Sequence, residues 1–310
     1  MKKNLKIAVL LGGTSLEREV SLNTGTQIAK SLEQGGYTVF KYDPKTDLEK
    51  FSLDFKNNEF DFCIPALHGK GGEDGSIQGY LESLRVPYCF SGVKASSVAM
   101  DKNISKVLVK EKGIKVLDSD LILSTEDIND LNINYPLIVK PNQGGSSINI
   151  NICYDYNELE KAVNIILSSN EEVLIEKYLK DVKELAVSVI EKDSNTLSLP
   201  VMEIIANKGV FYDYDSKYSQ RGSTHICPAE IDEEIYNLAQ KWSKLVFKTI
   251  GAKDLARVDF LYDDKNKKLY FLEINTIPGM TKTSLMPEAA KRKGYEFIDL
   301  LELIISNHIK

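Results

Sequence analysis

The chain has 310 residues, and because single hydrophobic cores stop growing at roughly 250–300 residues, we expect two or three domains. Hydrophobic residues make up 43% and charged residues 27%, and these near-average fractions exclude a disordered, fibrous or low-complexity chain. The formal net charge of −6 argues against a nucleic-acid-binding protein, whereas a site for an anionic ligand needs only a local cluster of donors.

The sequence has no pattern typical of a secreted or membrane protein. The apolar run after Lys2 and Lys3 covers only residues 7–11, which is shorter than the apolar region of about 7–15 residues in a signal peptide. No stretch approaches the length of a transmembrane span, so we expect a cytoplasmic protein without a membrane partner. The cysteines stand singly, without a C-x-x-C pair, and are expected to be buried thiols: Cys63, Cys89, Cys153 and Cys227.

The first part of the chain alternates strand and helix patterns. A short apolar run over residues 5–11 stops at Gly12 and Gly13, and a helical pattern follows from about Ser21 to Leu32. Further strands are predicted over residues 37–42, 60–66 and 86–90, with a helix over 76–84. This order predicts a parallel α/β sheet in a first domain over residues 1–90.

The remaining elements divide into two groups. We expect a central domain over residues 91–179, with helices over 94–112 and 154–168 and strands over 135–140 and 172–179. From residue 184 onward the pattern favours antiparallel pairing, which predicts an α+β C-terminal domain over residues 180–310. Its expected elements are a helix over 232–250 and strands over 184–190, 198–205, 255–262 and 268–274.

The last two strands form a predicted hairpin with an unusual polar face. Because side chains alternate along a strand, Arg257 and Asp259 share one face, as do Glu273 and Asn275. A hairpin symmetric about Asn266 places Asp259 opposite Glu273 and Arg257 opposite Asn275. The residues between them are expected to face the core: Val258, Phe260, Leu272 and Ile274.

Two opposed carboxylates repel each other unless a cation lies between them. Magnesium is the natural candidate, because it binds through one or two carboxylates and shares its other positions with water and phosphates. The alternative is a solvated outer face with incidental acidic residues. The polar set stands at strand centres, and the loop 276–281 follows it, which favours a metal–phosphate site.

Three other segments are candidates for ligand contacts. The chain lacks G-x-x-x-x-G-K-[ST] and G-x-G-x-x-G, so a phosphate loop must be of another kind. Residues 140–147 leave a strand with Lys140 and enter a Gly/Ser segment that either closes over phosphates or forms a plain hairpin turn. Residues 176–179 offer a weakly indicated edge for adenine. Residues 67–75 open a helix, and His68 there is either a ligand contact or a structural histidine.

Together these segments resemble the D-alanine–D-alanine ligase family of the ATP-grasp class across nearly the whole chain. The resemblance is carried by an ordered series of motifs: Val9–Ser15 with Glu17–Ser21, Ala66–Gly75, Met100–Lys102, Lys140-Pro141 with Ser146-Ser147, Glu176-Lys177, Tyr212–Tyr214 with Lys217-Tyr218, Cys227–Ala229, Arg257–Asp259, and Leu272–Asn275 with Pro278–Thr281.

The resemblance implies a three-domain ATP-grasp fold that binds ATP between the central and C-terminal domains. Its implied metal ligands are Asp259, Glu273 and Asn275, which would hold two Mg²⁺ or Mn²⁺ ions. The residues implied to contact ATP are Lys102, Lys140, Ser146, Ser147 and Lys217 near the phosphates, and Glu176, Lys177, Leu179 and Glu184 near adenine and ribose.

The implied reaction is ATP-dependent joining of two D-alanine molecules through an acyl phosphate, for cell-wall precursor synthesis. Arg257 and the backbone of Gly279 are implied to stabilise the oxyanion. Glu17 would bind the first ammonium, with His68 near the first carboxylate. Ser284 and Leu285 would receive the second carboxylate.

The resemblance also implies a lid over residues 208–227, closed by a hydrogen-bonded trio of Glu17, Ser146 and Tyr218. Tyr218 favours D-alanine over D-lactate by family analogy, and a homodimer is expected on the same ground. Related sequences usually carry a Glu before the Gly-Ser-Ser triplet and a Gly two places after it, where this chain has Gly144 and Asn149. The rival interpretations are another ATP-grasp carboxylate–amine ligase and a non-catalytic nucleotide-binding protein.

Overall fold

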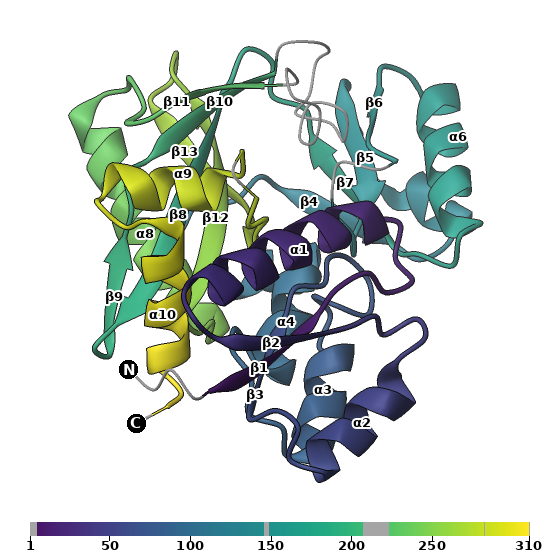
Figure 1. Cartoon of the computed structure of the whole chain (residues 1–310). Helices are drawn as coiled ribbons and strands as arrows, with labels where there is room; N and C mark the ends of the chain where they lie inside the picture. Colours follow the sequence, from purple (N-terminus) through teal and green to yellow (C-terminus); the bar gives the residue numbers. More distant parts are fainter. Residues whose placement is uncertain (1–4, 146–148, 207–222, 282, 310) are drawn as a thin grey trace.

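The computed structural model describes residues 5–145, 149–206, 223–281 and 283–309. Within these ranges the chain forms three β-sheets flanked by helices, each sheet built from a consecutive stretch of sequence (Figure 1). None of the helices that these ranges contain combines the length and the apolar character needed to cross a bilayer.

The first sheet is parallel, as the sequence predicts, and its strand order is β2-β1-β3. Strand β1 is buried almost throughout because helices cover both faces of a parallel sheet. The strand expected over residues 86–90 is wrong: only a single bridge joins Tyr88 to Cys63, and Phe90 turns to a φ of 73°, which ends the extended backbone. The elements here are β1 (Lys6–Leu10), α1 (Arg18–Gln34), β2 (Thr38–Tyr42), α2 (Leu48–Lys56), β3 (Phe62–Pro65) and α3 (Ser76–Leu84).

Two short helices follow, α4 (Val93–Met100) and α5 (Lys102–Lys110), where the sequence predicts one helix over 94–112. The break lies at Asp101, whose backbone is extended and whose carboxylate accepts a hydrogen bond from the Ile104 backbone N–H at 2.8 Å. A side-chain cap of this kind begins a new helix instead of continuing the old one. The break therefore turns α5 in a new direction.

The middle sheet has the order β4-β7-β5-β6, and all its pairs are antiparallel. Antiparallel pairing, which the sequence pattern favours only from residue 184 onward, thus begins earlier in the chain. Helix α6 is capped by Asp155, whose carboxylate accepts from the Glu158 N–H. The elements are β4 (Ser119–Ile122), η1 (Thr125–Asp130), β5 (Leu137–Pro141), β6 (Asn151–Cys153), α6 (Tyr156–Leu167) and β7 (Val173–Lys177).

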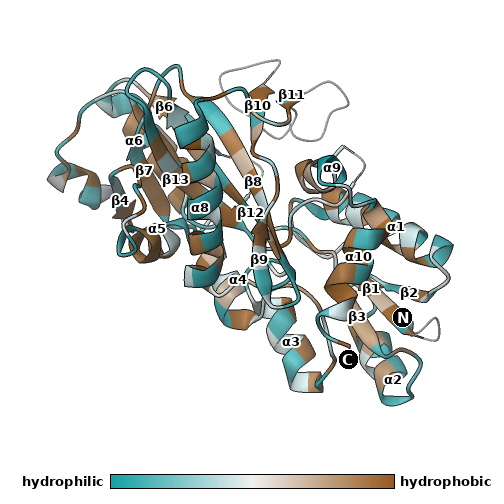
Figure 2. Cartoon of the chain, turned by 90° about the vertical axis from the view of Figure 1, so that its left-hand side faces the viewer, coloured by the Kyte–Doolittle hydropathy of each residue, from teal (hydrophilic) through white to brown (hydrophobic). Residues whose placement is uncertain are grey.

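The third sheet has the order β11-β10-β8-β12-β13, with β9 paired to the end of β8. The single strand expected over residues 198–205 is instead two strands, because Pro200 has no N–H to continue the ladder. Helix α8 packs on β8 and β12. Figure 2 shows many hydrophilic residues along this helix. The elements are β8 (Lys183–Lys192), β9 (Asn195–Ser198), β10 (Met202–Ala206), β11 (Ser223–Ile226), α8 (Glu233–Ile250), β12 (Leu255–Asp263) and β13 (Lys268–Asn275).

The last two helices are α9 (Leu285–Arg292), which packs against β8 of the third sheet, and α10 (Phe297–Ser306), which packs against α9 and α1. Helix α10 packs against α1 (Figure 1), and Leu300 and Ile304 belong to the same hydrophobic core as Ile28. The beginning and the end of the described chain are therefore held together by one core. Of the cysteines, Cys227 is only half-buried, whereas the other three are buried as expected.

Candidate active site

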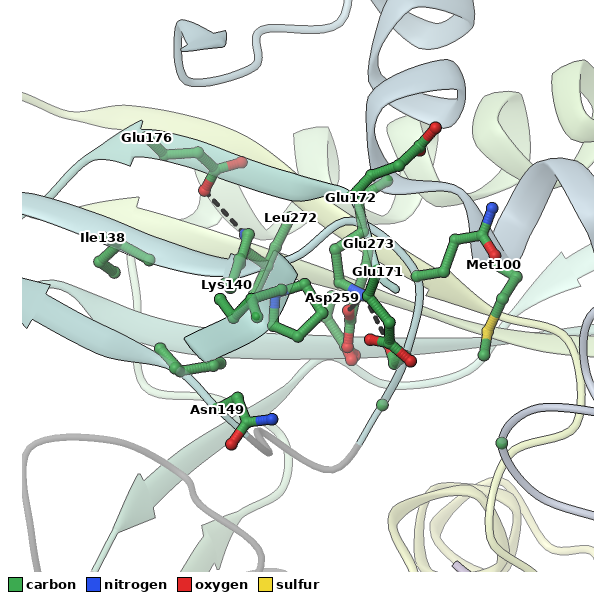
Figure 3. Close-up of a pocket in the computed structure, with 18 of the residues that line it drawn as sticks. Met100, Ile138, Lys140, Asn149, Glu171, Glu172, Glu176, Asp259, Leu272 and Glu273 are labelled. Carbon is green, nitrogen blue, oxygen red and sulfur yellow. Dashed lines mark hydrogen bonds and ion pairs between the residues drawn. The ribbon is translucent and has the colours of Figure 1, made fainter. Parts of the chain in front are cut away.

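A cavity of about 680 Å³ lies between the middle and third sheets, and a loop that follows β1 closes part of its rim. Its walls come mainly from β5 and β7 on one side and from β8, β12 and β13 on the other (Figure 3). Many of the residues predicted for the site line this cavity: Glu17, Lys102, Lys140, Glu176, Lys177, Leu179, Glu184, Asp259 and Glu273.

The hairpin of β12 and β13 has the predicted register. Asp259 pairs with Glu273 and Arg257 pairs with Asn275, so this prediction is confirmed. Arg257 Nη2 lies 2.8 Å from Asp259 Oδ2, and Lys102 Nζ lies 3.5 Å from Glu273 Oε2. Each carboxylate therefore has a cation beside it, which reduces the repulsion between the two acids.

A β-bulge interrupts the hairpin next to these acids. The register shifts after Asp259, so Phe260 pairs with Phe271 and Leu272 is the extra residue. Phe271 is buried, whereas Leu272 is half-buried and lines the cavity. The expectation that Leu272 faces the core is therefore wrong, because a bulge shifts the alternation of side chains by one residue.

The donor set on the hairpin fits a hard divalent cation. Among the described residues no three His, Cys, Asp or Glu side chains cluster as metal ligands, so the amide of Asn275 would have to complete the set with Asp259 and Glu273. Asn275 Oδ1 accepts the Ile277 N–H at 2.9 Å and keeps a second lone pair. Two carboxylates and an amide oxygen are ligands that Mg²⁺ prefers.

The facing wall holds a buried cluster of three charges. Lys140 Nζ lies 2.8 Å from Glu176 Oε2, and Lys106 Nζ contacts the other carboxylate oxygen, Glu176 Oε1 (Figure 3 shows the Lys140 contact). Burial, and then the Lys102 ammonium, lower the pKa of Lys140 to about 7. Burial, followed by Lys140 and Lys102, lowers the pKa of Lys106, and the Glu176 carboxylate in contact with it opposes this shift by favouring the ammonium form. Glu176 is therefore the counter-charge on which both lysines depend.

Lys106 was not predicted from the sequence, although a signal was present. Lys102 and Lys106 are four residues apart and so share one face of α5. Both are buried, whereas Ile104 and Val107 on the other side of the helix are exposed. A short amphipathic helix usually buries only its apolar face, and the burial of two lysines beside Val109 on α5 is visible only in the folded chain.

The N-terminus of α5 is joined to the loop that follows β5. Lys102 Nζ donates to the Gly144 carbonyl at 2.6 Å, and the Asn103 N–H donates to Asn142 Oδ1 at 2.9 Å. Asn149, which stands where related sequences have Gly, adopts a φ of 59°, a left-handed conformation that Asn tolerates better than most residues. The departure at this position therefore keeps the backbone shape.

Glu17 approaches both neighbouring glycine loops. A Cβ atom added to Gly69 would lie 2.7 Å from Glu17 Oε2, and one added to Gly145 would lie 3.2 Å from both carboxylate oxygens. Residues 69 and 145 must therefore stay small for Glu17 to occupy this place. The predicted partners of Glu17 in the lid trio, Ser146 and Tyr218, lie outside the described residues.

His68 is buried behind the same loop. Its Nε2 lies 3.0 Å from Thr24 Oγ1, and its carbonyl accepts from Ser15 Oγ at 2.6 Å. Burial, and then the positive charge of Arg257, lower the pKa of His68 to about 4, so the imidazole is neutral at pH 7. Glu73, which sequence reasoning did not single out, is also buried; its carboxylate accepts the Gly69 N–H at 2.7 Å, and burial raises its pKa well above the ordinary value.

The remaining predicted residues lie away from the main cavity wall. Ser284 Oγ accepts the Thr281 N–H at 3.0 Å, and a Cβ on Gly279 would lie 2.9 Å from that oxygen, so Gly279 and Ser284 are neighbours. Leu285 begins α9 and its side chain is buried in the core. Ser147, Lys217 and most of the predicted lid 208–227 lie outside the described residues.

The sequence and the fold of this chain match those of known proteins. Family models described as D-ala D-ala ligase C-terminus and D-ala D-ala ligase N-terminus match residues 108–306 and 41–91. The chain belongs to the D-alanine–D-alanine ligase family. The three-domain ATP-grasp architecture expected from the sequence is that of the solved members of this family and is confirmed.

The relatives align with nearly the whole length of this chain. The D-alanine–D-alanine ligase of Carboxydothermus hydrogenoformans is 40% identical and the one of Aquifex aeolicus is 39% identical; each match covers 97% of this chain, with 97% and 100% of the relatives covered. The Bacillus anthracis ligase solved with ATP superposes with a TM-score of 0.81 at 34% identity, covering 99% of this chain and 97% of that one. The VanG D-Ala:D-Ser ligase of Enterococcus faecalis also has a TM-score of 0.81, at 27% identity, covering 99% of this chain and 100% of that one.

Proposed function

We propose that this chain is an ATP-dependent ligase that joins two D-alanine molecules into D-alanyl-D-alanine for bacterial cell-wall precursors, releasing ADP and phosphate. ATP phosphorylates the carboxylate of the first D-alanine, and the amine of the second attacks the acyl phosphate. The protein supplies alignment and charge neutralisation instead of a covalent nucleophile.

Both walls of the cavity contribute residues to the proposed ATP site. Lys102 and Lys140, with Ser146, Ser147 and Lys217, hold the phosphates, and Glu176, Lys177, Leu179 and Glu184 hold adenine and ribose. Asp259, Glu273 and Asn275 are the residues that would bind two magnesium or manganese ions. Such ions neutralise negative charge on the transferred phosphoryl group when bound.

The proposed amino-acid sites extend from the cavity rim at the loop after β1 to the segment that leads into α9. Glu17 binds the ammonium of the first D-alanine, and neutral His68 lies near its carboxylate. Arg257 and the backbone N–H of Gly279 stabilise the oxyanion that forms during attack. Ser284 and Leu285, at the start of α9, receive the second carboxylate, because helix N-termini favour anions. Glu17, Ser146 and Tyr218 close the lid.

The observation that carries the proposal is the direct pairing of Asp259 with Glu273 at the edge of a cavity whose opposite wall contains the buried Lys140. Two acids facing a lysine across a cavity suit a nucleotide triphosphate with its metal ions better than a neutral ligand. A non-catalytic nucleotide-binding protein has no need for the acids in this arrangement.

The test is turnover by the purified chain with ATP and Mg²⁺ and D-alanine as the sole amino acid. Phosphate release and mass spectrometry of the product should both report the dipeptide, and L-alanine is the stereochemical control. D-serine added with D-alanine tests the activity named for the Enterococcus faecalis neighbour. Absence of stimulation by D-alanine, with turnover on another acid, would overturn the substrate assignment.

Assembly and location are part of the same proposal. We propose a cytoplasmic homodimer with domains at residues 1–90, 91–179 and 180–310. Light scattering of the purified protein should give twice the 34.8 kDa of the chain, and a monomer mass would contradict the dimer. Limited proteolysis should cleave near the second boundary, where Lys180 is exposed, before it cleaves near the first, where Phe90 and Ser91 are buried.

A further inference from the structure

Lys106 connects the two halves of the cavity. It lies on α5, which packs against β13 and α8 of the third sheet, whereas its partner Glu176 belongs to β7 of the middle sheet. The side chains of Lys106 and Glu176 are 3% and 1% exposed, so the contact is shielded from water. A buried charge pair of this kind has strict geometric requirements, because neither partner can be left alone.

Glu176 divides its two oxygens between two lysines. Oε1 contacts Lys106 and Oε2 accepts from Lys140 at 2.8 Å. If Lys140 is to hold a nucleotide phosphate, its ammonium must turn away from Glu176. Without a second cation that movement would leave a buried, uncompensated carboxylate, which costs several kcal/mol.

We infer that Lys106 is a positioning residue that keeps Glu176 charged and in place, so that Lys140 is released from Glu176 to bind a nucleotide phosphate. The inference rests on the proposed function only for the identity of the ligand as an adenine nucleotide. Lys106 itself does not touch the ligand. When Lys106 is absent, Lys140 is the one cation among the described residues that still pairs with Glu176, and nucleotide binding must break that pair.

The first experiment measures ADP binding by calorimetry in the intact chain, without D-alanine. Lys106→Met should weaken ADP binding by about tenfold or more and should raise the KM for ATP by the same factor. This is the loss expected when binding must break a hydrogen bond between charged groups, here the one from Lys140 to Glu176. The kcat at saturating ATP should change less than the KM. Lys106→Arg restores a cation and should bind ADP within about threefold of the wild type. Lys110→Met, one turn further along α5 and exposed, is the matched control and should leave both constants unchanged.

The second experiment separates positioning from general structural support. In the Glu176→Gln background there is no carboxylate to hold Lys140, so adding Lys106→Met should change the Kd for ADP by less than about twofold. A structural role alone predicts the same loss in both backgrounds. Equal losses, or no loss in the single variant, would overturn the inference. If Lys106→Met does not fold, Lys106→Gln keeps a donor without the charge and should show the tenfold loss.

The two proposals fail differently. A chain that binds ADP but does not ligate D-alanine loses the proposed function, while the Lys106 variants still decide the inference through ADP affinity. A chain that ligates D-alanine, and whose Lys106→Met variant binds ADP like the wild type, keeps its function and refutes the role of Lys106.

Discussion

On the hairpin wall of the cavity, strand pairing places two like charges, Asp259 and Glu273, opposite each other. On the facing wall, Glu176 lies between Lys140 and Lys106, so one carboxylate is shared by two cations. Opposed acids are stabilised by an added cation, whereas a buried acid between two lysines keeps one counter-charge when the other lysine moves. The same residue type, a glutamate in one cavity, therefore lies in an acid-rich environment on one wall and in a lysine-rich environment on the other.

Glu273→Gln should have the largest effect and should act on activity alone. We expect ligation to fall about a thousandfold, because one of the two carboxylates that would hold the proposed cation is lost. The free energy of unfolding should change by less than about 1 kcal/mol, because the substitution also relieves repulsion with Asp259. Phosphate release and thermal unfolding measure the two effects, with the exposed Glu234→Gln on α8 as control. Wild-type turnover by the folded variant would refute the metal assignment.

Glu176→Gln, on the other wall, should have its main effect on the free energy of unfolding. It leaves Lys106 and Lys140 buried without their counter-charge, so we expect a loss of about 3–5 kcal/mol in the free energy of unfolding. Chemical denaturation measured at pH 7 tests this value. Raising the pH should reduce the loss, because both lysines have lowered pKa values and can become neutral. Stability equal to that of Glu273→Gln would remove the distinction between the walls.

The bulge beside Glu273 predicts a contrast between two adjacent residues. Phe271→Ala should cost about 3–5 kcal/mol of stability, because the ring is fully buried. Leu272→Ala should cost less than about 1.5 kcal/mol and should instead weaken ATP binding, because the side chain faces the cavity. Denaturation and ATP titration of the two variants distinguish these outcomes. Similar stability losses at both positions would show that Leu272 belongs to the core.

His68 should give an effect that is absent at pH 7 and visible only as a pH dependence. Its pKa is about 4 in the folded chain, against an ordinary value of 6.5, so the unfolded chain takes up the proton first as the pH falls. The stabilisation from neutral His68 is complete above about pH 6.5 and is lost between pH 6.5 and 4, by up to about 3 kcal/mol. In His68→Gln the decrease of Tm over this window should be shallower. Parallel curves for the variant and the wild type would show that His68 is not buried as a neutral group.

The hairpin site is predictable because its determinants are local. Alternation of side chains and a short turn are enough to place Asp259 opposite Glu273 and Arg257 opposite Asn275, and the structure has this register. The same local reasoning fails at Leu272, since a bulge leaves no mark in the pattern of apolar residues. Local reasoning also predicts one helix where the structure has α4 and α5, because the periodic pattern of apolar residues does not reveal the cap at Asp101.

The sequence by itself determines the types of the elements, the polar face of the hairpin and the membership in a ligase family, since these depend on neighbouring residues and ordered motifs. Only the tertiary structure decides that the basic face of α5 is buried against Glu176, that Glu17 reaches Gly145, and that α10 completes the core of the first sheet. These contacts join residues far apart in the chain. Their energy comes from desolvated charge pairing and shared burial, which exist only after the sheets have packed together.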